Sequence, residues 1–242
     1  MARPREGDQS LEPLLPELVL IPGGTFTMGR DDRRKDEAPA HRVSIPAFAA
    51  ATSPVTNEEY ARFVAATGHA PPRFFDDGRF NAPAQPVVGV SWDDALAYCA
   101  WLSDHAGRRY RLPTEAEREF AALGGLAGVD WPWETVPGGR HPLEQVIASA
   151  DRPHPPGPAC ANGYGLRCMA ESVHEWCSDW YDPAYYAWSP VESPAGPARG
   201  TRKASRGGSW RHSVKFTRIT ARASLAPDRR YNDFGFRVYA DA

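Results

Sequence analysis

The chain of 242 residues contains no long apolar run and only 4 cysteines. A membrane-spanning helix needs about 18 or more consecutive apolar residues, so no membrane partner is expected. Residues 1–17 carry charges and prolines but lack the apolar segment of a signal peptide. These absences predict a cytoplasmic protein.

The few cysteines are spaced too widely for common metal motifs. No Cys-x-x-Cys pair occurs, so a structural zinc site is not expected. Cys99 lies on the apolar side of a predicted helix and Cys177 in a tryptophan-containing segment, so both are expected to be small buried hydrophobes. Cys160 and Cys168 flank a predicted turn at Asn162–Leu166 and can approach each other, although a functional pair is not expected.

Several catalytic and binding motifs are also missing. The chain has no glycine-rich phosphate loop, no Gly-x-Ser-x-Gly elbow and no His-Glu-x-x-His motif. It has no Lys/Arg-rich run with interleaved aromatics, so nucleic acid is not an expected partner. Nothing in the sequence indicates an oligomeric state.

Proline and glycine are abundant instead, at 24 and 21 residues, together with 8 tryptophans. Proline and glycine interrupt regular structure. Tryptophans supply large apolar surfaces that hold loops against a core. The composition predicts a fold rich in ordered irregular structure.

The net charge of −2 hides a basic C-terminal stretch. Its positive residues are Arg199, Arg202, Lys203, Arg206, Arg211, Lys215, Arg218, Arg222, Arg229, Arg230 and Arg237. Two interpretations remain open: ion pairs with the acidic remainder of the chain, which is the favoured one, or a surface that binds an anionic ligand.

Three segments share the start and stop signals of helices, at residues 56–68, 91–107 and 114–125. Each begins with Ser or Thr, has Asp or Glu three residues later and ends at glycine. The hydroxyl and the carboxylate of such a capping box satisfy backbone amides at the helix start. The pattern predicts three helices.

Strands are predicted on both sides of the Pro22-Gly23-Gly24 turn, at His41–Ile45 and at both ends of 206–238. Residues 130–160 are predicted to form a loop. The organisation that follows is a disordered lead-in at 1–17 and one α+β domain at 18–242.

Several motifs occur together in one order. They are Ile21-Pro22-Gly23-Gly24-x-Phe26-x-Met28-Gly29, Pro54-Val55-Thr56-Asn57, Pro86-Val87-x-Gly89-Val90-Ser91-Trp92, Arg111-Leu112-Pro113-Thr114-Glu115-Ala116-Glu117, Tyr164-Gly165-Leu166, Glu175-Trp176, Arg206-Gly207-Gly208-Ser209-Trp210 and Gly235-Phe236-Arg237. From about residue 18 onward the chain resembles the formylglycine-generating enzyme (sulfatase-modifying factor) superfamily. The resemblance implies an α+β variant of the C-type lectin fold, often with bound calcium.

The resemblance also implies a copper site that this sequence lacks. In formylglycine-generating enzymes, two cysteines in the segment after Gly-Gly-Ser bind copper(I). Here residues 210–222 contain no cysteine. Because copper(I) requires soft thiolate ligands, neither copper(I) nor the formylglycine reaction by that mechanism is expected.

Calcium and iron remain possible cofactors. Glu175 is the one obvious carboxylate retained from the calcium loop that the resemblance implies, and Glu171 is a possible addition. An iron site typically uses two histidines and a carboxylate. The candidates here are His174 and His212 with Glu175 or Asp233.

The resemblance places a binding groove along the C-terminal segment. Its candidate residues are Ser209, Trp210, Arg211, His212, Arg218, Arg222 and Asp233. Ser209 has no assignable base and is not expected to be a nucleophile, whereas Arg222 and Asp233 are expected to pair. Arginines favour carboxylate or phosphate groups, so the expected partner is a peptide or a small anionic ligand.

Two functions remain open. The protein is either an oxygen-dependent, oxidoreductase-like enzyme that modifies a peptide or small metabolite, or a non-catalytic binding module that uses the same groove. The first is favoured because the framework around the groove matches the family apart from its cysteines. Fold alone does not decide between them.

Overall fold

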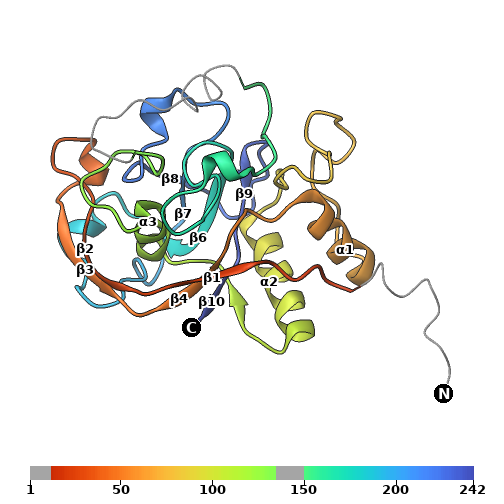
Figure 1. Ribbon diagram of the computed structural model, residues 1–242, viewed down its shortest axis with the longest axis horizontal. Coiled ribbons are helices and arrows are strands. Elements are labelled where there is room, and N and C mark those ends of the chain that lie inside the picture. Colours follow the sequence, from red (N-terminus) through yellow and green to blue (C-terminus); the bar gives the residue numbers. More distant parts are fainter. Residues whose placement is uncertain (1–11, 135–149) are drawn as a thin grey trace.

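The computed structural model describes residues 12–134 and 150–242. It has an α+β architecture of short elements joined by long loops (Figure 1). Residues 1–11 of the predicted lead-in and 135–149 of the predicted loop lie outside the described residues. The remainder of the lead-in, residues 12–17, is held against the domain: the Thr52 amide donates to the Glu17 carbonyl at 2.9 Å, and Arg62 Nη1 donates to the Glu12 carbonyl at 3.2 Å.

The three predicted helices are confirmed. They are α1 (Asn57–Thr67), α2 (Trp92–Ala106) and α3 (Glu115–Leu123). Each carries a complete capping box and ends at a glycine in the left-handed conformation. Short 3-10 helices occur at Lys35–Glu37, Pro158–Cys160, Tyr185–Ala187 and Val214–Phe216.

Ten strands form three sheets in the described parts of the chain. A four-stranded antiparallel sheet has the order β1 (Leu18–Ile21), β4 (Phe48–Ala51), β10 (Tyr239–Asp241) and β5 (Tyr110–Arg111). A hairpin joins β2 (Gly24–Met28) to β3 (His41–Ile45). The third sheet has the order β8 (Arg222–Leu225), β7 (Lys203–Arg206), β6 (His174–Trp180) and β9 (Phe234–Gly235), with β9 parallel to β6.

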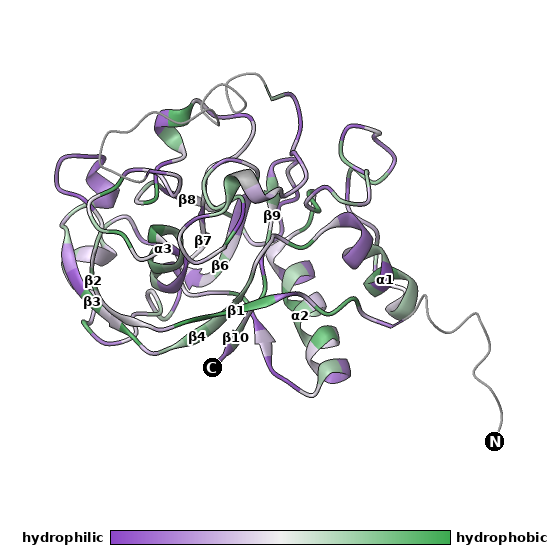
Figure 2. Cartoon of the chain, in the orientation of Figure 1, coloured by the Kyte–Doolittle hydropathy of each residue, from purple (hydrophilic) through white to green (hydrophobic). Residues whose placement is uncertain are grey.

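The described elements bury two large apolar clusters and two smaller ones. In Figure 1, α1 and α2 lie at one end of the molecule and the β2–β3 hairpin lies at the other. Tyr60, Tyr98 and Phe236 pack in the first cluster, and Phe48 and Phe120 in the second. Figure 2 shows β1 coloured as hydrophobic and the short helix after β2, Lys35–Glu37, as hydrophilic, although Asp36 and Glu37 of that helix are buried.

A third part of the interior is charged and lies between α3 and the third sheet. Arg118 Nε donates to Glu175 Oε2 at 2.7 Å, and Arg237 Nη2 donates to Glu175 Oε1 at 2.9 Å. All three side chains are at most 1% exposed. Such pairs need complete hydrogen bonding to offset the loss of water, and Arg118 and Arg237 also donate to backbone carbonyls.

The same helix supplies carboxylates to the basic C-terminal stretch. Arg222 donates to both oxygens of Glu115 at 2.8 Å, and Arg206 pairs with Glu119. Farther along, Arg218 donates to Glu37 at 2.6 Å. The prediction of internal ion pairs is therefore confirmed for these arginines.

Candidate functional site

The candidate site lies where β6 begins beside β9. The strands place His174 opposite Phe234, and the His174 amide donates to the Asp233 carbonyl at 2.8 Å. The His174 and Phe234 rings stack with centroids 4.7 Å apart. Parallel pairing thus fixes the His174 ring next to Asp233, although 59 positions separate them in the sequence.

A glycine turn brings a third segment over this point. Gly207 and Gly208 have φ values of 97° and 63°, a region that glycine adopts readily. A Cβ on Gly208 would lie 2.6 Å from Cγ2 of Thr217, so the turn has no room for a side chain. Beyond it, the Trp210 amide donates to the Ser172 carbonyl at 3.0 Å, just before β6.

Two imidazoles and a carboxylate gather here. One potential ligand atom from each of His174, His212 and Asp233 lies within 4.8 Å of the other two. Ser209 Oγ donates to Asp233 Oδ2 at 3.1 Å and lies 3.4 Å from His212 Nδ1. Because the single hydroxyl hydrogen goes to Asp233, Ser209 can only accept from His212 Nδ1, which leaves the His212 Nε2 lone pair free for a ligand.

Burial keeps both imidazoles neutral. His174 is 5% exposed, and its Nδ1 is buried without a hydrogen-bond partner. Burial, reinforced by the nearby His212, lowers the pKa of His174 to about 3. Burial also lowers the pKa of His212, although Asp233 opposes the shift. Neutral imidazole is the form that coordinates metals.

The rim of the site is aromatic and cationic. The Phe216 and Tyr231 rings are each 45% exposed. Phe216 lies 6.4 Å from the His212 ring and Tyr231 lies 6.3 Å from the Phe234 ring, measured between centroids. The half-exposed Arg211 guanidinium lies 3.9 Å from Asp233. The rim therefore offers apolar surface and positive charge to a ligand, since the Lys215 ammonium also lies 5.0 Å from the centre of the Phe216 ring.

The structure brings together only part of the predicted set. Ser209, Trp210, Arg211, His212 and Asp233 lie at the site, together with His174. The remaining predicted residues, Glu175, Arg218 and Arg222, are engaged elsewhere.

The expected Arg222–Asp233 pair is not formed, because Arg222 is 2% exposed and bound bidentately to Glu115. Arg218 reaches Glu37 instead of lining a groove. These two predictions were wrong for the same physical reason. The acidic partners come from loops and helices far away in the sequence, and a buried guanidinium takes the nearest carboxylate.

Glu175 does not fit a calcium or iron ligand. Both of its oxygens accept hydrogen bonds from the guanidinium groups of Arg118 and Arg237. Those two positive charges already neutralise the carboxylate, and hard cations require free oxygen ligands. Glu175 is thus a structural ion-pair partner, and Asp233 is the carboxylate beside the histidines.

Phe216 and Tyr231 were not identified from the sequence. Each is a single large aromatic among basic and polar neighbours, a pattern typical of a partly buried loop residue. The available signal was their closeness in sequence to His212 and Asp233. Their exposure became evident only in the fold.

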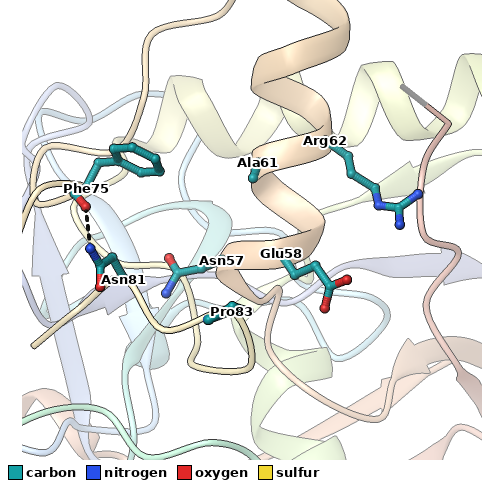
Figure 3. Close-up of a pocket in the computed structure, with 7 residues that line it drawn as sticks. All are labelled: Asn57, Glu58, Ala61, Arg62, Phe75, Asn81 and Pro83. Carbon is teal, nitrogen blue, oxygen red and sulfur yellow. Dashed lines mark hydrogen bonds between the residues drawn. The ribbon is translucent and has the colours of Figure 1, made fainter. Parts of the chain in front are cut away.

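A separate pocket lies beside α1 (Figure 3). Its volume is about 470 Å³, and Asn57, Arg62 and Phe75 contribute to its walls. Its two asparagines are used structurally: Asn81 donates to the Phe75 carbonyl at 2.9 Å, and Asn57 donates to the Phe80 carbonyl at 2.8 Å. None of its lining residues belongs to the histidine–aspartate cluster.

In the described part of the chain, the helices are all too short or too polar to cross a membrane. The fold, with its Gly-Gly-Ser turn above the β6–β9 junction, defines a formylglycine-generating-enzyme-like variant of the C-type lectin class. The family described as Sulfatase-modifying factor enzyme 1-like domain matches residues 5–242. The chain belongs to this family.

Known proteins agree with the assignment. Formylglycine-generating enzyme from Streptomyces coelicolor is 35% identical over 285 residues, covering 93% of this chain and 89% of that protein. The solved structure of PvdO from Pseudomonas aeruginosa is 31% identical, with a TM-score of 0.81 and coverage of 94% and 95% of the two chains. A protein named serine/threonine-protein kinase pkn1 from Chlamydia pneumoniae is 34% identical, but the chain spans only 38% of its length.

Proposed function

We propose that this protein is a metal-dependent oxidoreductase that acts on a peptide or a small anionic metabolite without a copper–cysteine pair. One observation carries the proposal: His174, His212 and Asp233 converge within 4.8 Å, from segments that are distant in the sequence. The family includes enzymes named formylglycine-generating enzyme, which supports catalysis on this fold.

The residues fit a nonheme iron(II) ion. Two imidazoles and one carboxylate are the donor set that such iron uses in oxygen-dependent enzymes. The buried, unpartnered His174 Nδ1 marks a place where a polar partner is missing. When bound, iron supplies oxygen-dependent oxidation chemistry; copper(I) is disfavoured because this donor set contains no thiolate.

The surrounding side chains would hold the donors in place. Ser209 donates to Asp233 Oδ2 and thereby orients the carboxylate. The Phe234 ring supports the His174 ring from one side. Outer partners of this kind fix ligand orientation and typically change metal affinity 10- to 100-fold when removed.

The rim fits the proposed substrate class. Arg211 presents a partly exposed guanidinium beside the cluster, which suits a carboxylate or phosphate group. Phe216 and Tyr231 add exposed aromatic surface next to the same cluster. A peptide side chain or a compact anionic metabolite would contact both kinds of surface.

Metal analysis tests the proposal. Protein purified without chelators and reconstituted anaerobically with iron(II) is expected to hold one iron per chain at this site. His212→Ala and Asp233→Asn should weaken iron binding at least tenfold, whereas His105→Ala, at the end of α2, should leave it unchanged. Equal iron retention in all three variants, or no iron in the parent protein, would contradict the proposal.

The second candidate is a non-catalytic binding module, favoured by the exposed rim of Arg211, Phe216 and Tyr231. Under this alternative, metal-free protein binds an anionic peptide with salt-sensitive affinity, and Arg211→Ala weakens that binding. Binding that requires the reconstituted metal supports the enzyme instead.

A further inference from the structure

A second group of metal-ligating side chains lies outside the candidate site. The Sγ atoms of Cys160 and Cys168 are 3.2 Å apart, which confirms that the two residues approach each other. The turn between them is closed by the Asn162 side chain, whose Oδ1 accepts from the amides of Tyr164 and Leu166 at 3.0 and 3.1 Å. Local structure therefore holds the two thiols side by side.

His154 and Glu171 complete the group. One potential ligand atom from each of His154, Cys168 and Glu171 lies within 4.8 Å of the other two. His154 Nδ1 lies 3.2 Å from the Pro155 carbonyl and so carries the ring proton. The opposite nitrogen, Nε2, therefore carries a lone pair, and it is buried without a hydrogen-bond partner.

Glu171 also has an unsatisfied atom. Its side chain is 1% exposed. Oε2 accepts from the Ala170 amide at 2.9 Å, but Oε1 is buried without a hydrogen-bond partner. Buried polar atoms are nearly always paired, and leaving a carboxylate oxygen unpaired is costly. Two lone-pair donors are thus left unsatisfied beside the Cys168 thiol, and the Cys160 thiol, which donates to the Gly157 carbonyl at 2.9 Å, lies 3.2 Å from Cys168 Sγ.

We propose that His154, Cys160, Cys168 and Glu171 bind one Zn²⁺ ion. Two sulfurs, one imidazole nitrogen and one carboxylate oxygen make up the four ligands of a closed, tetrahedral zinc site. The dication offsets two of the three negative charges of the thiolates and the Glu171 carboxylate, and it gives His154 Nε2 and Glu171 Oε1 the partner that each lacks. The site does not depend on the proposed iron chemistry.

A copper(I) ion or a disulfide at these residues would satisfy fewer of the four groups than zinc does. Copper(I) is satisfied by soft thiolates and would leave the Glu171 oxygen unpaired. A disulfide between Cys160 and Cys168 would leave both the imidazole and the carboxylate unsatisfied. Only a borderline cation that accepts sulfur, nitrogen and oxygen together uses all four groups.

The ion would stabilise the chain segment that leads into the candidate site. It would join residues 153–160 to residues 168–171, which lead directly into β6 and His174. Ser172, next in the chain, accepts the Trp210 amide that anchors the glycine turn. Zinc at this position would therefore hold the segment on which the histidine–aspartate cluster is built.

Zinc titration of metal-depleted full-length protein, in competition with a chromophoric chelator, tests the site. The expected result is one tightly bound Zn²⁺ per chain. Replacement by Co²⁺ should give a thiolate-to-cobalt charge-transfer band. Cys168→Ser and His154→Ala are expected to weaken zinc binding at least tenfold, while the matched controls Cys99→Ala and His105→Ala leave it unchanged.

Two further measurements make the outcome decisive. His212→Ala should keep the thiolate–cobalt band, which separates this site from the proposed iron site. His154→Ala changes a loop residue and provides a test even if Cys168→Ser does not fold. Three results would each overturn the proposal. They are a parent protein without the cobalt band, an intact mass two hydrogens lower because the two thiols form a disulfide, and zinc affinity unchanged in His154→Ala.

Discussion

At the scale of single residues, Ser209 connects the groups of the candidate site. It is fully buried, donates to Asp233 Oδ2 and accepts from His212 Nδ1. One hydroxyl therefore sets both the direction of the carboxylate and the tautomer of the imidazole. We assign it a positional role, because its hydroxyl is fully buried and its hydrogen is donated to Asp233.

Ser209→Ala is expected to weaken iron binding about 10-fold or more, because outer-sphere hydrogen bonds to metal ligands have effects of that size. The loss would be measured by anaerobic iron titration. Ser205→Ala on β7 is a matched control, since the Ser205 hydroxyl is buried but has no hydrogen-bond partner. Equal iron affinities of the two variants would argue against the positional role.

Individual side-chain roles were predicted unevenly from the sequence. Ser209 and His212, close to the Gly207-Gly208 turn, lie beside Asp233 as local chain geometry dictates, and their role in a site stays a prediction. Arg218 and Arg222 were misplaced because their partners, Glu37 and Glu115, lie on other elements. Sequence shows that a charge exists, but burial and pairing depend on the whole fold.

At the scale of elements, α3 has an unusual role for a helix of 9 residues. Its charged residues Glu115, Arg118 and Glu119 are buried and hold β6, β7 and β8 through ion pairs. A short helix has little apolar surface, and here hydrogen-bonded charges replace part of it.

Arg118→Met should destabilise the protein by about 1–3 kcal/mol, because it removes a charge-assisted hydrogen bond to Glu175 and one to the Met169 carbonyl, while Arg237 still neutralises Glu175. Denaturant unfolding gives the change. Adding Glu175→Gln should increase the loss, since Arg237 would then be a buried guanidinium without a carboxylate partner. Arg79→Met, which breaks an exposed pair with Asp77, is expected to cost at most about 1 kcal/mol.

The helices were predictable because capping boxes are local signals, and all three are complete in the structure. The first strands were predictable from the Pro22-Gly23-Gly24 turn for the same reason. The parallel β6–β9 pair was not, because its members are short and far apart in the sequence. This pair creates the candidate site, so the geometry of the site could not be predicted from sequence patterns.

At the scale of the whole molecule, buried acids connect stability to pH. Asp179 Oδ2 accepts from the first amide of α3, on Glu115, at 2.9 Å, and from Ser178 Oγ at 3.0 Å. Burial, with the nearby charge of Glu115, raises the pKa of Asp179 from 3.8 to about 7. The folded protein therefore favours the protonated form.

The sign of the pH effect follows from this shift. Below about pH 4, Asp179 contributes about 4 kcal/mol to the free energy of unfolding. This contribution is lost as the pH rises through about 7. Asp179→Asn cannot ionise, so its free energy of unfolding should vary less between pH 4 and 8. Unfolding at several pH values measures the difference, with the exposed Asp228→Asn as control. Parallel pH profiles for Asp179→Asn and the parent would contradict the assignment.

The order of the strands has a consequence for biosynthesis. β9 supplies the partner of His174, and β10 fills the gap between β4 and β5 in another sheet. Both come from residues 234–241, which the ribosome adds after every other element of the domain. Translation must therefore pass this segment before either sheet is complete, and His174 meets Phe234 only after the last strands of the domain have been made.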